Sequence, residues 1–440
     1  MSLSFKYLDE FNCDMVVLFL FLRNTIICRD MEVIPKLMTD RKKFGKPHIQ
    51  NDIYESADGV RFFGPHGLIT DVGTDVWKTK RSIMDLLFTK SFLSDSVVGI
   101  NEVGRNFVDK LRVRAETGLT FDVVKDVQRC VFNVIAVVGF NWTEDMLAEN
   151  ANAVVAMART FTDIMDMKSK ELTKFDIPYI ESDDQPLIQQ LINPIRDLLK
   201  EHLETVDGES SSQSRENVLS QIVRANKAVP HLTTEDMVDD YLVFMLSATG
   251  TVSSTVSCVL WFLSIYPEVY RKCKTEVDEI YKGKEELDYQ DVTKLDYLEK
   301  VVKETMRLKP PIIHTGRQCA ALGAKVGQHY FPGFTNFVIP ISHLHNDSRN
   351  WENEKEFQPE RFSPEAVKNI KPYSYMPFSA GQRNCIGKHF AMMEIKILIS
   401  LIIKNFVIVN PVPGEKVLIM VENHTNRPKN GVNIKLISRQ

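Results

Sequence analysis

The chain has 440 residues and a formal net charge of −4, and its basic residues form no extended Lys/Arg-rich run, so we expect no nucleic-acid partner. Hydrophobic residues make up 44% and charged residues 25%, proportions that are ordinary for a soluble globular protein. The seven cysteines are widely spaced and include no C-x-x-C pair, which disfavours a disulfide framework and a structural zinc site. We therefore expect a reducing compartment, with six of the seven cysteines buried as small hydrophobes.

Residues 1–75 mix short apolar runs with Gly and Pro, a pattern that predicts a small sheet and loops. The run Met15–Leu22 is apolar but much shorter than the roughly twenty residues that a helix needs to cross a bilayer. We expect a β-strand there, continued after a turn by Thr25–Ile27. No signal peptide or N-terminal transmembrane anchor is recognised in this stretch, so peripheral membrane contact is the most that we expect.

From about Trp77 to Val269, apolar residues recur every three or four positions, which predicts helices. The pattern is clearest over Asn101–Arg114 and Val123–Phe140. The polar, serine-rich run Asp207–Glu216 predicts an exposed loop between two helices.

The segment Tyr241–Ile265 contains 25 residues without a charge, a length that could also cross a membrane. Eight of these residues are Ser or Thr, and Gly250 lies among them. This composition favours a helix through the centre of a large soluble protein. Thr233 or Thr234 can cap its start, and Pro267 should end it.

The C-terminal part changes character along its length. Residues 268–282 and 291–308 predict two more helices. After Pro310, Gly, Pro and β-branched residues become frequent, which indicates irregular strands and a long meander. Lys388–Ile408 predicts a final amphipathic helix. We therefore expect residues 1–440 to form one domain, mainly α with a small β region.

The most informative stretch is Phe378-Ser-Ala-Gly381-Gln-Arg383-Asn-Cys385-Ile-Gly387, which matches F-x-x-G-x-R-x-C-x-G at every fixed position. A cysteine thiolate is a strong donor to haem iron. The two glycines allow a tight turn and a close approach to a porphyrin, the arginine suits a haem propionate, and the phenylalanine covers the sulfur. Backbone N–H groups and the start of a helix near Gly387 would stabilise the sulfur's charge. A buried thiol in a glycine-containing loop would explain an isolated cysteine, but not the whole pattern.

Three arginine-containing patterns accompany this loop. Glu304-Thr-Met-Arg307 places its two charges on one helix face, although most such pairs are solvated. Pro359-Glu360-Arg361-Phe362 follows downstream. Trp77-Lys-Thr-Lys-Arg81 puts an indole and a guanidinium on one face, and the alternative is an exposed basic helix, which we expect Lys78 and Lys80 to be.

Taken together, these motifs resemble the cytochrome P450 superfamily in order and spacing, over roughly residues 5–435. The resemblance implies the cytochrome P450 fold, a single large helical domain around a buried haem b. It implies that Cys385 is the axial iron ligand, and that Arg361 joins Glu304 and Arg307 in a buried structural triad. The residues that it directs toward the haem propionates are Trp77, Arg81, Arg317 and Arg383.

Within the superfamily, the stretches Leu295–Pro311 and Pro377–Lys388 are most similar to cholesterol 24-hydroxylases, and fatty-acid hydroxylases share much of them. The resemblance implies insertion of one oxygen atom of O2 into an apolar small molecule, a sterol or a fatty acid. Electrons would come through NADPH–cytochrome P450 reductase at the cytoplasmic face of the endoplasmic reticulum membrane. Lys78, Lys80 and Lys388 could guide such an acidic partner.

The central helix departs from the family's pattern of small residue–Gly–x–acid–Thr–Thr/Ser. Here it reads Ser247-Ala248-Thr249-Gly250-Thr251-Val252, so Thr251 and the small Ala248 are kept while Gly250 replaces the acid. In the family the acid and the threonine help to deliver the protons that oxygen activation consumes. Thr251 could also distort the helix toward a water-holding groove. We expect water to replace the acid as a poorer proton source, with peroxide released.

Two other functions stay open at this point. A cytochrome P450-fold isomerase or dehydratase that acts on a lipid hydroperoxide would not need the missing acid. A haem-binding or lipid-binding homologue could have lost turnover. His343, His345 and Asp347 could suggest a metal site, but the family has a similar H-x-D segment in an ordinary connection, and we expect the same here.

Overall fold

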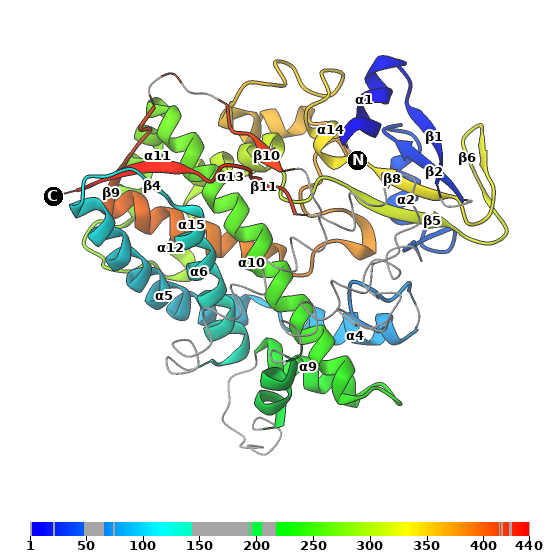
Figure 1. The fold of residues 1–440 in the computed structure, drawn as a ribbon, viewed down its shortest axis with the longest axis horizontal. Helices are drawn as coiled ribbons and strands as arrows, with labels where there is room; N and C mark the ends of the chain where they lie inside the picture. Colours follow the sequence, from blue (N-terminus) through cyan, green and yellow to red (C-terminus); the bar gives the residue numbers. More distant parts are fainter. Residues whose placement is uncertain are drawn as a thin grey trace.

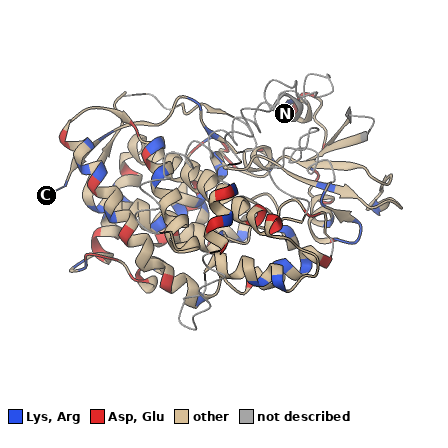
Figure 2. Ribbon diagram, turned by 60° about the horizontal axis from the view of Figure 1, so that its bottom comes forward, with Lys and Arg blue, Asp and Glu red and all other residues tan. Residues whose placement is uncertain are grey.

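The computed structural model describes residues 2–20, 23–47, 66–73, 75–142, 193, 196–204, 217–412, 414, 417–421 and 425–439. The predicted loop Asp207–Glu216 lies outside these residues. Helices fill one side of the molecule and a small sheet lies at the other, so the predicted mainly α architecture is confirmed (Figure 1). Lys and Arg positions are interspersed with Asp and Glu positions along the helices (Figure 2).

The helices of the molecule differ widely in length. The described helices are α1 (Ser2–Glu10), α2 (Ile34–Thr39), α4 (Asp75–Asp85), α5 (Lys90–Glu116), α6 (Val124–Val134), α9 (Val218–Lys227), α10 (Thr234–Ile265), α11 (Pro267–Ile280), α12 (Tyr289–Thr293), α13 (Asp296–Leu308), α14 (Ile341–His345) and α15 (Lys388–Asn405). Four short helical segments complete them: the π-helix η1 (Ile135–Gly139) and the 3-10 helices η2 (Pro359–Phe362), η3 (Ala366–Asn369) and η4 (Gly381–Arg383).

The N-terminal hairpin forms as predicted. Strand β1 (Met15–Leu20) pairs antiparallel with β2 (Arg23–Cys28), and β2 runs parallel to β8 (Asn336–Ile339). With β5 (Thr315–Cys319) and β3 (Phe44–Gly45), these strands form a sheet of order β1-β2-β8-β5-β3. Helix α1 was not predicted, because its nine residues are too few to display a helical period.

Small sheets made from distant segments complete the β structure. Strand β12 (Asn433–Ser438) lies between β4 (Phe121–Asp122) and β9 (Phe406–Val409), while β6 (Ala324–Val326) pairs with β7 (His329–Phe331) and β10 (Met420–Val421) with β11 (Arg427–Pro428). The helix predicted over Lys388–Ile408 therefore ends early, at Asn405. The β-branched residues that follow pair with β12 instead.

Helix α10 crosses the middle of the molecule (Figure 1). As predicted, Thr233 caps its start, where its hydroxyl accepts a hydrogen bond from the Asp236 N–H, and the helix ends at Ile265, just before Pro267. Among the described residues, α10 alone is long and apolar enough to cross a membrane, yet 72% of its most apolar window is buried inside the protein. The prediction of a core helix is confirmed.

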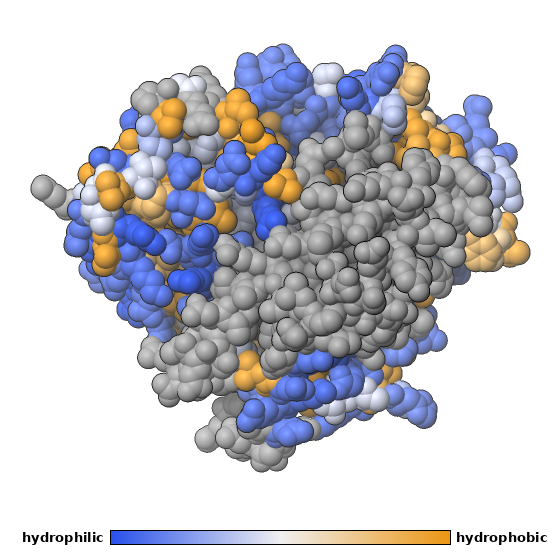
Figure 3. Space-filling model, in the orientation of Figure 1, coloured by the Kyte–Doolittle hydropathy of each residue, from blue (hydrophilic) through white to orange (hydrophobic). Residues whose placement is uncertain are grey.

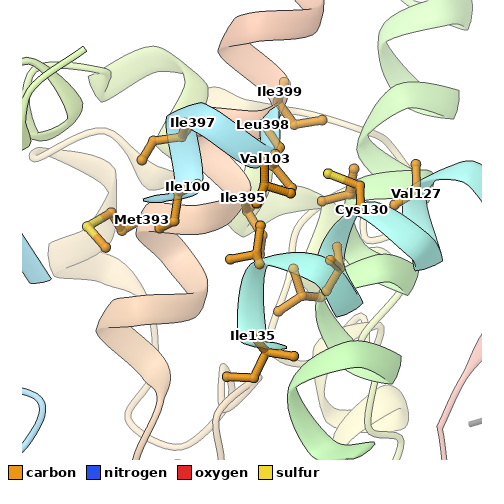
Figure 4. Packing of buried hydrophobic residues seen from close by; sticks show 14 of the residues in the cluster. Ile100, Val103, Val127, Cys130, Ile135, Met393, Ile395, Ile397, Leu398 and Ile399 are labelled. Atoms are coloured by element: carbon orange, nitrogen blue, oxygen red, sulfur yellow. The ribbon is translucent and has the colours of Figure 1, made fainter. Parts of the chain in front are cut away.

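The main core lies where α5, α6 and α15 meet beside α10. Figure 4 shows Ile100 and Val103 of α5 packed against Ile395 and Leu398 of α15. On the face drawn in Figure 3, the apolar side chains that are visible form separate patches among hydrophilic ones. Among the cysteines, Cys13 is half-buried and Cys385 is exposed, so five of the seven are buried rather than the expected six.

Candidate functional site

A cavity of about 350 Å³ opens between α4, α10, α15, η1 and the loop that carries Cys385. Helices α10 and α15 each turn one face toward it, because residues three or four apart share a helix face. From α15 these residues are Phe390, Ala391 and Glu394, and from α10 they are Val243, Phe244, Leu246, Ser247, Ala248, Thr251 and Val252. Ile135 and Gly139 of the π-helix η1 also line it, and the sequence pattern did not distinguish this segment from α-helix.

The Cys385 loop is closed by a hydrogen bond of 2.9 Å from the Cys385 N–H to the Phe378 carbonyl. Gly381 has a φ of +71°, and a Cβ there would lie 1.9 Å from the Met38 carbonyl oxygen. This glycine is therefore needed for a left-handed turn against α2, and it does not line the cavity. The expected tight turn at Gly381 is thus present, and a close approach of its backbone to a porphyrin stays a prediction.

The Cys385 thiol faces the cavity, directly before the N-terminus of α15. Cys385 is exposed toward the cavity, but the protein atoms packed on its other sides limit hydration of the thiol and raise its pKa. A hydrogen bond from the Gly387 N–H and the charges of Arg81 and Lys388 lower that pKa. A bound cation would shift this balance toward the thiolate. Gly387 also lines the cavity, and a Cβ there would meet no atom within 4 Å, so the backbone borders open space at this point.

Three cations gather beside the cavity. Burial, together with the nearby Arg383 and Arg317, lowers the pKa of Lys46 to about 7. Burial lowers the pKa of Arg317 to about 10, and burial with the Arg317 charge lowers that of Arg383 to about 9, although Asp71 opposes the change. A ligand with two negative charges bound here would compensate these three cations for their lost hydration and would offset the repulsion between them. Lys46 was not singled out in the sequence, where it is an isolated lysine.

The residues predicted to reach propionates are brought to this region, but protein groups occupy their donors. The Trp77 indole N–H donates to the Leu68 carbonyl at 3.2 Å, and the Arg383 guanidinium stacks 3.7 Å above the indole ring. Arg81 donates to Asp85 and to Asn384. Trp77, Arg81 and Arg383 all line the cavity.

Arg317 lies behind the cavity wall rather than in it. Its guanidinium donates to the Gly316 carbonyl at 2.7 Å, and the residues that line the cavity here are His314 and Thr315. Contact of Arg317 with a propionate stays a prediction.

The expectation that Lys80 is exposed on a basic helix is wrong. Its side chain is 1% exposed and forms an ion pair with Asp240 of α10. The sequence placed Lys80 between Lys78 and Arg81, and nothing nearby in the chain signals a partner on α10. Lys78, by contrast, is exposed and pairs with Asp75.

On α10, the Thr251 hydroxyl donates to the Ser247 carbonyl at 2.7 Å. Helix α10 continues through this point without a break, and a local distortion toward a water-holding groove stays a prediction. Ala248 lines the cavity beside Thr251, but Gly250 does not; a Cβ at Gly250 would lie 3.6 Å from the Thr425 side chain. Thr425, whose short segment carries no sequence motif, was missed.

The Glu304–Arg307 pair is fully buried, and both side chains are 0% exposed. Arg307 Nε and Nη2 donate to the two carboxylate oxygens of Glu304 at 2.7 and 2.8 Å, in bidentate geometry. Arg361 Nε lies 3.4 Å from Glu304, and its side chain is 12% exposed. The structure thus brings the three predicted residues together, with Arg361 as a looser third member.

His345 is a buried link in this architecture. Its Nε2 accepts a hydrogen bond from the Met376 N–H at 2.8 Å, and its Nδ1 lies 3.2 Å from the Met306 carbonyl. Burial lowers the pKa of His345 to about 3, so the ring is neutral at pH 7. Among the described residues no cluster of metal-ligating side chains occurs, so no metal site is found at His343, His345 and Asp347.

Glu394 was also missed, although an acid one turn from Phe390 and Ala391 on an apolar helix face was a readable signal. Glu394 is 1% exposed and lines the cavity, and its Oε1 has no hydrogen-bond partner in the described part of the chain. Burial raises the pKa of this carboxyl well above its usual value.

The position of Glu394 predicts a pH-dependent stability difference. At pH values between the Glu394 pKa of the unfolded chain and the raised pKa of the folded chain, only the unfolded chain releases this proton. The free energy of unfolding therefore falls by about 1.4 kcal/mol for each unit by which the pH rises in this range. Glu394→Gln removes this loss. Urea denaturation of the holoenzyme should show a stabilising effect of Glu394→Gln at pH 7 that shrinks as the pH falls toward 5. Glu268→Gln, on the surface of α11, is the control; a Glu394→Gln effect that is independent of pH would contradict the assignment.

A family model described as Cytochrome P450 matches residues 1–434. The chain belongs to the cytochrome P450 family. Cytochrome P450 3A6 of Oryctolagus cuniculus is 28% identical over 374 residues, which cover 82% of this chain and 74% of that relative. Cytochrome P450 4c21 of Blattella germanica is 27% identical over 356 residues, which cover 77% of this chain and 70% of that relative.

The fold agrees with this membership. The crystal structure of a mutant haem domain of cytochrome P450DA matches with a TM-score of 0.84 and 21% identity, covering 99% of this chain and 93% of that one. The predicted cytochrome P450 fold is therefore confirmed. As a member of this family the chain is a monooxygenase, and its cofactor is haem b.

The residues around the cavity fit a haem. Cys385 offers a thiol at the cavity wall, Gly387 leaves open space beside it, and the Lys46, Arg317 and Arg383 charges suit two propionates. When bound, the haem supplies the chemistry of oxygen activation. With the haem bound, the residues around Cys385 would stabilise the charge of the sulfur, the nearby Lys and Arg residues would compensate the propionates, and Thr251 and the apolar wall would face an entering ligand.

Proposed function

We propose that this monooxygenase, with residues 1–440 as one catalytic domain, inserts an oxygen atom into a C–H bond of an apolar lipid, a sterol or a fatty acid. The observation that carries the proposal is the apolar wall of the Cys385 cavity. Its apolar residues include Phe88, Phe92, Val243, Phe244, Leu246, Ile312 and Ile341. Such a wall stabilises a hydrocarbon substrate by burial and offers few groups for a polar one.

The similarity of Leu295–Pro311 and Pro377–Lys388 to cholesterol 24-hydroxylases supports a sterol within this class. Fatty-acid hydroxylases share much of these two stretches, so a fatty acid is the second member of the class to test.

We propose that electrons reach the haem from NADPH through NADPH–cytochrome P450 reductase, at the cytoplasmic face of the endoplasmic reticulum. Lys78 and Lys388 support contact with an acidic partner, because both are exposed. Lys388 directly follows the Cys385 loop, and Lys78 lies on α4, whose Arg81 donates to the Asn384 carbonyl of that loop. Lys80 is removed from this set because it is buried.

The proton supply is the unusual feature of the proposed reaction. The Thr251 hydroxyl donates a hydrogen bond to the Ser247 carbonyl, and the neighbouring Gly250 has no carboxyl group. Protons must then come through water or from another buried group, and a positioned acid is the better source. We therefore expect much of the NADPH consumed to appear as hydrogen peroxide.

Reconstitution with the reductase tests both substrate and coupling. A panel of sterols and fatty acids should produce substrate-induced Soret shifts, and the binders should yield oxygenated products at less than one equivalent per NADPH. Gly250→Glu should raise the product-to-NADPH ratio, since a Cβ at this position makes only ordinary contact with Thr425. Haem content and melting temperature must be compared, because replacing the helix-interior glycine itself stabilises by on the order of 1 kcal/mol. Efficient coupling without the added acid would refute the proton argument.

The missing acid also favours a second candidate, an isomerase or dehydratase that acts on a lipid hydroperoxide and needs no proton delivery. Consumption of a lipid hydroperoxide without reductase, and no NADPH oxidation with it, would establish that function. Haem binding without either reaction would indicate a homologue that has lost turnover.

A further inference from the structure

The segment 66–73 forms part of the cavity wall although it belongs to no helix or strand. Its Leu68 and Ile69 line the cavity that contains Cys385. A wall built from turns depends on tertiary contacts for its position, because it has no backbone ladder of its own.

On one side, this segment is attached to α10 through a buried ion pair. The Leu68 N–H donates to Asp240 Oδ1 at 3.2 Å, and Asp240 forms an ion pair with Lys80 of α4. Lys80 Nζ in turn donates to the His66 carbonyl at 3.0 Å. The Lys80 and Asp240 side chains are 1% and 2% exposed, so the hydrogen bonds from the Lys80–Asp240 pair to the segment are shielded from solvent.

On the other side, the same segment is attached to the Cys385 loop. The Leu68 carbonyl accepts hydrogen bonds from the Trp77 indole at 3.2 Å and from Arg383 Nη1 at 3.3 Å. Arg383 Nη2 also donates to the Asp71 carbonyl at 2.6 Å. Leu68 therefore connects the central helix, through its N–H, with the loop that carries the thiol, through its carbonyl.

Stability alone is a weak reason for such a pair. Removing two charges from water is expensive, and well-packed apolar residues often stabilise a protein equally well. What an apolar pair cannot do is accept the Leu68 N–H and donate to the His66 carbonyl. The distinctive contribution of the Lys80–Asp240 pair is therefore the orientation of the 66–73 segment.

We propose that Lys80 and Asp240 are positioning residues that hold the Leu68–Ile69 wall against α10, and thereby set how tightly the cavity retains an apolar ligand. Neither residue lines the cavity, so both act through Leu68. The proposal applies to any apolar ligand and does not depend on the lipid specificity proposed above.

The test compares two iron-binding probes on the holoenzyme. Imidazole needs only the iron, whereas 4-phenylimidazole also needs the apolar wall. Lys80→Met/Asp240→Leu removes both charges and both segment contacts while keeping similar volume. We expect this variant to retain its haem content and to bind 4-phenylimidazole about tenfold more weakly, while its affinity for imidazole changes little. Loss of a few charge-assisted hydrogen bonds predicts an effect of this size.

Two matched variants make the readout specific. Lys80→Gln/Asp240→Asn removes the charges but can keep the hydrogen bonds to Leu68 and His66, so it should restore most of the 4-phenylimidazole affinity. Arg196→Met/Asp239→Leu removes the adjacent buried pair, whose Arg196 Nη1 and Asp239 Oδ1 atoms lie 2.8 Å apart, and it should leave the ratio of the two affinities unchanged. An unchanged ratio in Lys80→Met/Asp240→Leu, or an equal change in the control, would overturn the proposal.

A measurement on the unmodified holoenzyme keeps the test decisive if a variant fails to fold. Amide hydrogen exchange of a peptide covering residues 66–73 should be slow, and 4-phenylimidazole should slow it further. Exchange as fast as that of an exposed loop would show that the pair does not hold the segment.

Discussion

Replacing Cys385 with alanine should abolish the long-wavelength Soret band of the reduced carbon-monoxide complex and most of the bound haem. Cys385 is the sulfur-containing residue that lines the cavity, and a thiolate at this position would be stabilised by the Gly387 N–H and by the start of α15. Alanine supplies no ligand, and no other residue of the loop contains sulfur. The spectrum and the haem content per chain are the measurements.

Cys273→Ala is the matched control for this prediction. Cys273 is buried in α11 and does not line the cavity, so its loss should lower stability modestly and leave the spectrum intact. Retention of the band and of haem by Cys385→Ala would show that the iron ligand is a different residue.

Features fixed by neighbouring residues were predictable from the sequence. The hairpin of β1 and β2, the Thr233 cap of α10 and the helix start after Gly387 each depend on a few consecutive positions. The same holds for the Glu304–Arg307 pair, since residues three apart on a helix meet whatever surrounds them.

Features fixed by segments far apart in the chain were not predictable. Lys80 looked solvated because its partner, Asp240, lies on another helix, and Gly381 is required by the Met38 carbonyl of α2. The helix predicted over Lys388–Ile408 ends early because β12 offers its last residues a strand partner. Periodicity carries no information about such partners, and tertiary contacts override local propensity.

Arg307→Ala should prevent formation of a stable holoenzyme. Besides Glu304, the Arg307 guanidinium donates to the carbonyls of His345, Glu354 and Glu356, at 2.9, 2.7 and 3.0 Å. Its removal leaves a buried Glu304 carboxylate and three carbonyls without this donor. Breaking a buried pair in this way costs about 3–5 kcal/mol, a large part of the 5–15 kcal/mol that typically stabilises a folded protein.

Arg361→Ala should be milder. Arg361 is partly exposed, lies 3.4 Å from Glu304 and donates to the Asn353 carbonyl at 2.8 Å. We expect a loss of roughly 1–2 kcal/mol and partial haem content. Arg271→Ala breaks an exposed pair with Glu268 and serves as the control, with an expected change of less than about 0.5 kcal/mol. Urea denaturation midpoints and haem content measure how severe each of the three substitutions is. Equal losses for Arg307→Ala and Arg361→Ala would refute the expected order.

The expected order of failure follows from how Arg307 is connected to the Cys385 loop. Arg307 holds the His345 backbone, the His345 ring accepts the Met376 N–H, and two residues later the Phe378 carbonyl accepts the Cys385 N–H. Loosening Arg307 therefore loosens the loop that presents the thiol before the main core of α5, α6 and α15 is disturbed. In a urea titration of Arg361→Ala, the Soret band should decline at a lower concentration than the far-ultraviolet circular dichroism. Coincident transitions would mean that the triad stabilises the whole fold rather than the loop that holds the haem.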